Sequence, residues 1–130
     1  MIKICSFFCL PIEEQRIGQV FSLANSYPRN VGEVSGTVRC LVPSWSDVQA
    51  FKEHRISETE FTDRYRAQLK AQWQGVKKWM NSLTPDDEIY LCCWEKTGFC
   101  HRFLVAKMLR KHRPDPVSYT HLTLPTILRV

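Results

Sequence analysis

Two short apolar runs along the chain predict β-strands. Residues 2–9 are rich in isoleucine and phenylalanine and end before Pro11. Residues 88–93 are apolar on both faces of a strand, which is typical of a central strand covered on either side. Part of 34–42 predicts a third, short strand, and residues 12–25 predict either a short helix or a loop.

Three segments carry helix signals. Ser44 is a capping residue for a short helix, because an aspartate follows three residues later. Ser57 and Glu60 have the spacing of a capping box, which predicts a long helix over 58–82. Its apolar positions recur at helical spacing, at Phe61, Tyr65, Leu69, Val76, Met80 and Leu83. Residues 99–113 predict the last helix, whose cations near the C-terminal end suit the helix dipole.

These elements predict one α/β domain with a small, mostly parallel sheet flanked by helices in three layers, as in Rossmann-like folds. A chain of 130 residues has the length of a single domain. Its apolar fraction of 44% is high enough to offset the chain entropy lost on folding, so the bulk of the chain is expected to fold. We expect the domain to occupy residues 1–116.

The last segment, residues 117–130, differs from the rest in composition. It carries no charged residue before Arg129. Thr120, Leu122 and Leu124 alternate as in a half-buried strand. The segment also resembles one translated frame of a transposon-type sequencing adaptor, and we favour this interpretation. We therefore expect a non-native, poorly packed tail in place of the native C-terminal sequence.

Charge and cysteine content narrow the classes of function. The net charge of +5 and the pI of 9.0 mildly favour anionic partners, yet lie far below the charge density of a dedicated nucleic-acid binder. No apolar run approaches the roughly 20 residues of a membrane span, and no signal-peptide cleavage site follows the first run. Six cysteines beside an adequate core favour reduced thiols, so we expect a cytoplasmic protein.

The strand–loop–helix segment 88–113 gathers the residues with the most chemistry. They are Cys93 at the strand end, Glu95 and Lys96 in the loop, and Cys100, His101 and Arg102 at the helix start. In open α/β sheets, ligands bind beyond the carboxyl ends of the strands, and a helix start favours anions. This cluster predicts a site for a small ligand that bears a phosphate or a carboxylate.

Four of these residues suit thiol chemistry. We expect Cys93 or Cys100 to be a nucleophile or redox thiol, because a helix start lowers the pKa of a thiol. His101 would transfer a proton, and Glu95 would orient the reacting groups.

Lys96 and Arg102 are the expected ligand-binding residues, Arg102 through a bidentate contact with the anion.

A metal site is the less favoured alternative, because structural zinc sites usually use two tight cysteine pairs. Its ligands would be Cys93, Cys100 and His101 with Cys5 or Cys9. We expect neither a metal nor a cofactor.

Two further interpretations stay open. The basic run 110–113 and the net positive charge fit a non-enzymatic module associated with nucleic acid, although a solvated helix end explains the run more simply. Alternatively, Cys93, Glu95 and His101 only hold the loop against the sheet. Whether the protein is an enzyme, and its oligomeric state, are left open by the residues.

The same segment resembles the bacterial domain-of-unknown-function family four-eight-eight. The family is marked by a leucine-cysteine-x-glutamate-lysine motif, a short loop, and then a cysteine-histidine-arginine motif that opens an apolar helix. In this chain the first motif corresponds to residues 91–96 and the second to residues 100–102. The runs 41–44 and 56–61 also look like the family, and the likeness spans most of 20–113. The resemblance implies a small cytosolic α/β protein and supports the site, without naming its chemistry.

Two places depart from the family pattern. Asn25 stands where the family has a basic residue. The loop between Lys96 and Cys100 has only three residues, fewer than in relatives. Either difference would weaken an anion site without changing the fold.

Overall fold

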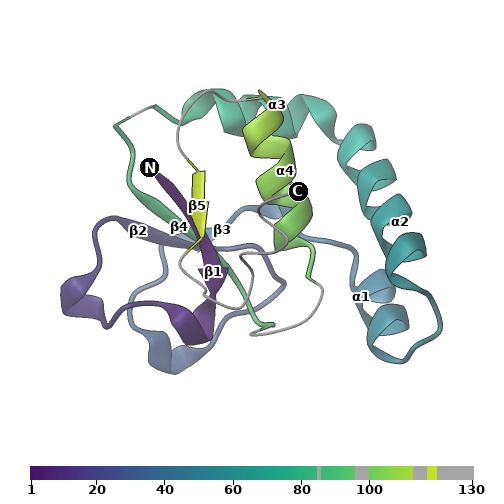
Figure 1. Ribbon diagram of the computed structural model, residues 1–130, viewed down its shortest axis with the longest axis horizontal. Coiled ribbons are helices and arrows are strands. Elements are labelled where there is room, and N and C mark those ends of the chain that lie inside the picture. The colour runs from purple at the N-terminus through teal and green to yellow at the C-terminus, as the bar shows by residue number, and fades with distance from the viewer. Residues whose placement is uncertain (85, 96–99, 113–116, 120–130) are drawn as a thin grey trace.

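Five parallel strands form one sheet in the order β3-β2-β4-β1-β5 (Figure 1). The computed structural model describes residues 1–84, 86–95, 100–112 and the backbone of 117–119. The strands are β1 (Ile2–Ser6), β2 (Gln19–Ser22), β3 (Gly36–Thr37), β4 (Ile89–Cys93) and β5 (Val117–Tyr119). β4 pairs with β1 and β2, and all of its residues are buried. The predicted α/β class with a parallel sheet and a central strand over 88–93 is confirmed.

The helices are α1 (Trp45–Lys52), α2 (Glu58–Ala71), α3 (Trp73–Ser82) and α4 (Arg102–His112). The hydroxyls of Ser44 and Ser57 accept backbone N–H groups three residues ahead, at 3.3 and 3.1 Å, so both predicted caps are confirmed. The single helix predicted over 58–82 is two helices. The break lies at Gln72, whose N–H closes α2 on three carbonyls and whose φ and ψ of −110° and 20° are not helical.

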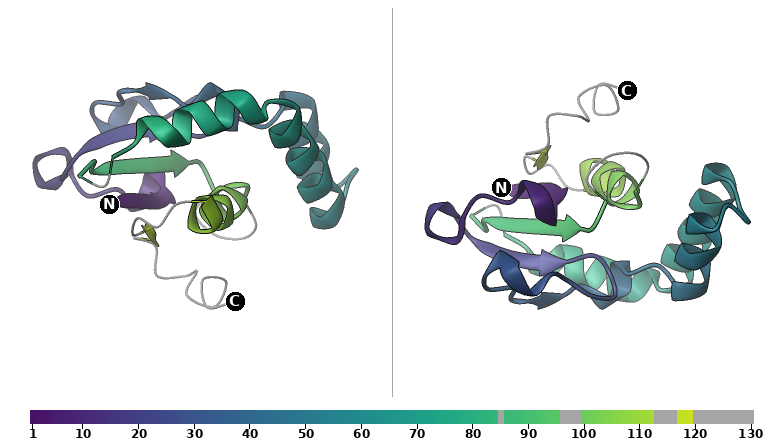
Figure 2. Two further views of the ribbon diagram at one scale, coloured as in Figure 1. Left: turned by 90° about the horizontal axis from the view of Figure 1, so that it is seen from above. Right: turned by 90° about the horizontal axis from the view of Figure 1, so that it is seen from below.

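The two faces of the sheet are covered by different kinds of structure. The helices pack on one face, here the helix face, where the main core forms; its fully buried members include Ile4, Leu23, Leu41, Val76, Leu91, Val105 and Leu109. On the other, the loop face, a smaller cluster contains Cys5, Phe7, Val20, Tyr90 and Cys92 under Leu10, Val31 and Val34. Figure 2 shows α3 on the β2 side of the sheet and α4 on the β1 side.

Strand order explains why the helices share a face. The connections from β1 to β2 and from β2 to β3 run one way along the sheet, and those from β3 to β4 and from β4 to β5 run the other way. Since parallel crossovers are right-handed, the two sets lie on opposite faces. The first set contains prolines and glycines and forms only 3-10 turns in place of α-helix. In the described part of the chain, the expected third layer is therefore irregular.

The segment 12–25 contains strand β2, where the sequence suggested a helix or a loop. β2 follows Gly18, whose φ is 115°. A Cβ atom at this position would lie 1.9 Å from the carbonyl oxygen of Glu88. Only glycine permits this approach, which lets the Gln19 N–H donate to the same carbonyl at 3.2 Å and begins the pairing of β2 with β4. The first strand is also shorter than expected, because Phe7–Cys9 form a 3-10 turn.

The last described residues belong to the sheet. β5 pairs in parallel with residues Ile2, Lys3 and Ile4 of β1. Its three residues are the start of the segment 117–130, whose remaining part lies outside the described residues, so the non-native tail stays a prediction. No described helix has the length and apolar character needed to cross a bilayer.

Candidate functional site

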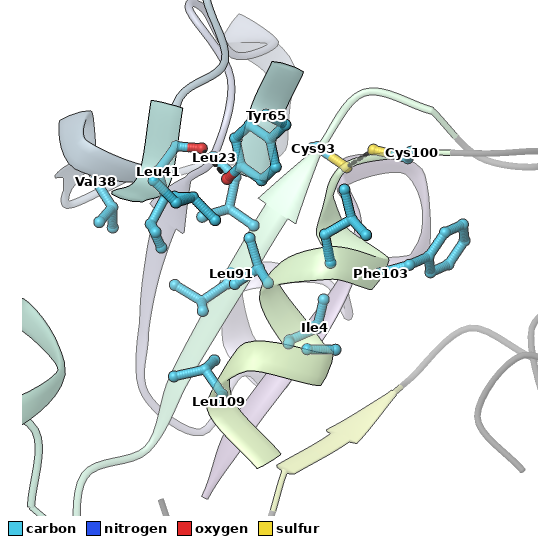
Figure 3. Packing of buried hydrophobic residues seen from close by; sticks show 14 of the residues in the cluster. Ile4, Leu23, Val38, Leu41, Tyr65, Leu91, Cys93, Cys100, Phe103 and Leu109 are labelled. Carbon is cyan, nitrogen blue, oxygen red and sulfur yellow. Dashed lines mark hydrogen bonds between the residues drawn. The ribbon is translucent and has the colours of Figure 1, made fainter. Parts of the chain in front are cut away.

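Two cysteines meet where β4 ends and α4 is about to begin. Cys93 is the last residue of β4, and Cys100 lies two residues before α4; both side chains are buried. Their Sγ atoms are 2.7 Å apart (Figure 3). Both thiols are free, and we call Cys93 and Cys100 the site pair.

Arg102 is the charged partner of this pair. Its side chain is fully buried, and Nη1 donates to Cys93 Sγ at 3.1 Å and to the backbone carbonyl of Glu95. Burial alone lowers the pKa of Arg102, but the sulfurs of Cys93 and Cys100 outweigh it and raise the pKa. Among the described residues, Arg102 Nε and Nη2 have no hydrogen-bond partner. Burying a guanidinium destabilises the fold unless the group has acceptors nearby, so the hydrogen bond to the Cys93 sulfur offsets part of the cost of burying Arg102.

His101 is fixed in one tautomer by the fold. Its Nε2 lies 2.7 Å from the carbonyl oxygen of Leu23, just after β2. A carbonyl only accepts, so Nε2 carries the proton and Nδ1 of the neutral ring is an acceptor. Nδ1 lies 3.6 Å from Cys100 Sγ, in reach of the thiol proton. The Tyr65 ring packs edge-on against the imidazole, with 5.5 Å between centroids.

Glu95 is a second acceptor for the Cys100 thiol. Its Oε2 lies 3.3 Å from Cys100 Sγ, and its Oε1 lies 4.0 Å from Nζ of Lys52 on α1. The ligand atoms of Cys93, Glu95 and Cys100 all lie within 4.8 Å of one another, a spacing that suits a metal ion. Cys5 lies on the loop face instead, so it is too far round the sheet to complete the metal set considered from the sequence.

A small pocket of about 50 Å³ opens beside these groups. Its polar wall consists of Asn25, Lys52, Glu95, Cys100 and His101, and its remaining wall is mostly apolar. This volume holds a small ion or a few water molecules, far less than the hundreds of Å³ of a pocket for a drug-sized ligand. Cys93 and Arg102 do not line the pocket.

Burial shifts the pKa of the Cys100 thiol in the direction opposite to the one expected from the sequence. The sequence suggested that a helix start lowers the pKa of Cys100. The structure places this residue before the helix, where burial and then the Cys93 sulfur raise the pKa well above its usual value, while His101 partly offsets the effect. Ionisation of Cys100 therefore depends on a nearby proton acceptor.

Five of the six predicted site residues come together in space, namely Cys93, Glu95, Cys100, His101 and Arg102. Lys96 lies outside the described residues. Sequence reasoning missed Leu23, Lys52 and Tyr65, which reach the site from elsewhere, and connected Asn25 with the site only through the family resemblance. Recognition of β2 would have indicated Leu23 and Asn25, since the carboxyl ends of parallel strands share one edge.

Comparison with known proteins identifies the family of the chain. A family model described as the Active DUF488-N3 subclade matches residues 9–113. The chain belongs to the DUF488 family. The resemblance noted from the motifs is thereby confirmed, and the matched range includes every residue of the candidate site described above. No curated protein and no solved structure matches the chain significantly.

Proposed function

We propose that the candidate site around Cys93 and Cys100 is a thiol site that binds or acts on a small ligand bearing a carboxylate or a phosphate. The observation that carries the proposal is the position of Cys100: its side chain lines the pocket, and its sulfur lies 3.6 Å from Nδ1 of His101. A nucleophilic thiol needs an adjacent base when its own pKa is high. Cys100 is accordingly the reacting thiol and His101 its proton acceptor.

The surroundings of His101 support this proton transfer. Burial lowers the pKa of His101, but the Cys100 sulfur, the Leu23 carbonyl and Glu95 outweigh it and raise the pKa. The imidazolium that forms when Cys100 loses its proton is thus stabilised on both sides of the ring. The same contacts tie the start of α4 to the end of β2, so a structural role and a chemical role coexist in these residues.

We assign the anionic group of the ligand to the part of the pocket lined by Lys52 and Asn25. Lys52 has an exposed side chain that lines the pocket, and Asn25 offers an amide beside it. The sequence suggested Arg102 as the clamp on the anion. Since Arg102 is buried behind the pocket and donates to Cys93, we reassign it as a partner of the sulfur.

Competition between two small alkylating agents tests the proposal. Iodoacetamide and iodoacetate differ mainly in charge, and labelling at neutral pH followed by tryptic mass spectrometry locates the modified cysteine. Cys100 lies in fragment 97–102, and Cys92 and Cys93 lie in fragment 79–96. We expect Cys100 to be labelled first, and Lys52→Gln to reduce the rate with iodoacetate more than that with iodoacetamide.

The control variant is Cys92→Ser, which removes an equally buried thiol on the loop face and is expected to leave the fast labelling unchanged. Cys100→Ser is expected to remove it. If Cys100 in the unaltered protein reacts no faster than Cys92, the proposed function is wrong.

A second candidate function rests on a groove of about 440 Å³ between α2, α3 and α4. Its polar and aromatic wall consists of Arg66, Lys70, Trp73, Lys107, Lys111 and His112. Cations beside an aromatic ring favour the phosphates and bases of a single nucleic-acid strand. We expect a fluorescent oligonucleotide to bind with steep salt dependence, and the double variant Lys107→Glu, Lys111→Glu to abolish binding. Binding that persists in this variant would exclude the groove.

A further inference from the structure

We infer that the site pair is a redox couple, in which a small peroxide oxidises Cys100 and Cys93 then closes a disulfide bond with it. The inference rests on the proposed function, because it takes Cys100 as the reacting thiol. It adds a second role for the same site and names a class of oxidant.

The first support is the distance between the two sulfurs. A disulfide bond is about 2.05 Å long, and the Sγ atoms of Cys93 and Cys100 are already 2.7 Å apart. The two sulfurs therefore need to approach each other by less than 1 Å to reach bonding distance. Both residues belong to the same core cluster.

The second support is the difference between the two thiols. Cys100 lines the pocket and meets an incoming molecule, whereas Cys93 lies behind it and is fully buried. Arg102 donates to the Cys93 sulfur at 3.1 Å, which holds that sulfur in place behind Cys100. The pocket thus presents Cys100 to the oxidant and keeps Cys93 as the second, resolving thiol.

The chemistry balances in two steps. Cys100 gives its proton to His101 and its thiolate attacks one peroxide oxygen; the O–O bond breaks, an S–O bond forms, and the leaving oxygen takes the proton and departs as water or an alcohol. Cys93 then attacks the Cys100 sulfur; the S–S bond forms, the S–O bond breaks, and hydroxide leaves with the Cys93 proton as water. Two thiols are oxidised by two electrons, and one peroxide is reduced.

The size of the pocket selects the oxidant. A volume of about 50 Å³ admits hydrogen peroxide or a short alkyl hydroperoxide. A peptide disulfide does not fit in this space, so exchange with such a disulfide is not the expected route. The oxidant class is therefore a small hydroperoxide.

The chain contains its own control for this reaction. Cys5 and Cys92, here the rear pair, face each other on β1 and β4 with their Sγ atoms 3.4 Å apart. Both are buried on the loop face, away from the pocket. Proximity and burial are therefore similar in the two pairs, and the charged neighbours and the pocket differ.

Treatment of the full chain with one equivalent of hydrogen peroxide at neutral pH tests the inference. Tryptic digestion without reductant is expected to give fragment 79–96 linked to fragment 97–102. Cys92→Ser is expected to keep this link, which assigns it to Cys93. Cys93→Ser is expected to stop at the sulfenic acid of Cys100, which dimedone traps, and Cys100→Ser is expected to give neither product.

Different failures have different meanings. If Cys100 is alkylated rapidly but peroxide produces no link, the redox couple is wrong and the proposed function stands. If Cys100 is not alkylated rapidly, both are wrong. A link between fragments 4–16 and 79–96 that survives Cys93→Ser would also overturn the inference, because the rear pair would then oxidise without any site. Should Cys93→Ser not fold, as judged by circular dichroism, the link that persists in Cys92→Ser and is lost in Cys100→Ser decides the inference.

Discussion

The site pair and the rear pair are alike in most respects, and they differ in the groups that surround the sulfur atoms. Each pair joins a residue of β4 to a second cysteine, and each is buried. The rear pair lies among apolar side chains of the loop face, where the hydrogen bond with Cys5 and burial raise the pKa of Cys92. The site pair adds a guanidinium, an imidazole, a carboxylate and a pocket.

Neighbours in sequence can therefore belong to different environments. Cys92 and Cys93 are consecutive, but successive side chains of a strand point to opposite faces. Cys92 contacts Cys5 and Cys93 contacts Cys100, so the two neighbours belong to different pairs. A count of six cysteines could not show that the two pairs have different surroundings. The proposed reactivity of Cys100 rests on the groups around its sulfur.

The largest expected difference between the pairs is in stability. Cys93→Ala removes the sulfur that faces the buried guanidinium of Arg102, and we expect a loss of about 3 kcal/mol in the free energy of unfolding. Cys92→Ala leaves only a small cavity, and we expect about 1 kcal/mol. Urea denaturation of the two variants measures both values. Equal losses would contradict the importance of the hydrogen bond from Arg102 to Cys93.

Loss of the proton acceptor should slow the site thiol alone. In His101→Gln the side chain still offers an amide to the Leu23 carbonyl but has no basic nitrogen. We expect the alkylation rate of Cys100 to fall about 100-fold, in the range of general-base effects. Tyr65→Phe is the matched control, because it keeps a ring beside His101 and loses only the hydroxyl that donates to Leu41. An unchanged rate in His101→Gln would exclude His101 as the acceptor.

A cation added at the pocket should strengthen the preference for anions. Asn25→Arg restores the type of residue that the family resemblance leads one to expect at this position, and we expect the rate ratio of iodoacetate to iodoacetamide at Cys100 to rise about fivefold. The rise should shrink with added salt. Gln74→Arg adds the same charge at an exposed position of α3 and should leave the ratio unchanged. A similar rise in both variants would mean that net charge alone is responsible.

The smallest expected effect is a pH dependence of the free energy of unfolding, in which the first decline comes from His101 beside the site pair. The pKa of His101 in the folded chain is raised, so its contribution to stability is complete below about pH 6.5 and is lost as the pH rises through the folded pKa. The raised pKa values of Cys100 and Cys92 act in the same direction above about pH 8.5. Urea denaturation across this range should show a first decline that His101→Gln abolishes. A first decline that persists in His101→Gln would show that another group causes it.

Local signals in the sequence predicted the elements that are fixed by local physics. Ser44 and Ser57 mark helix starts, and the fully apolar run 88–93 is the central strand. β2 was missed because four residues carry too little periodicity, and its place in the sheet depends on pairing with β4. The helix break at Gln72 was missed because the apolar stripe continues across it.

The site was predictable only where its residues are close in sequence. Cys93 and Arg102 are only nine positions apart, so the clustering of the residues between them was visible in the chain. The roles were less visible, because they depend on burial. Arg102 is enclosed behind the pocket, and Cys100 has a raised pKa, and neither fact follows from residue order. Leu23 and Lys52 reach the site only through folding.

The geometry of the candidate site depends on Gly18, although Gly18 does not contact any residue of that site. The residue precedes β2, and the loop that supplies Leu23 and Asn25 follows the same strand. A methyl group at Gly18 would push β2 away from Glu88, and the carbonyl that sets the tautomer of His101 would move with it. Replacement of Gly18 would therefore be expected to slow the alkylation of Cys100 although every residue around the pocket stayed the same.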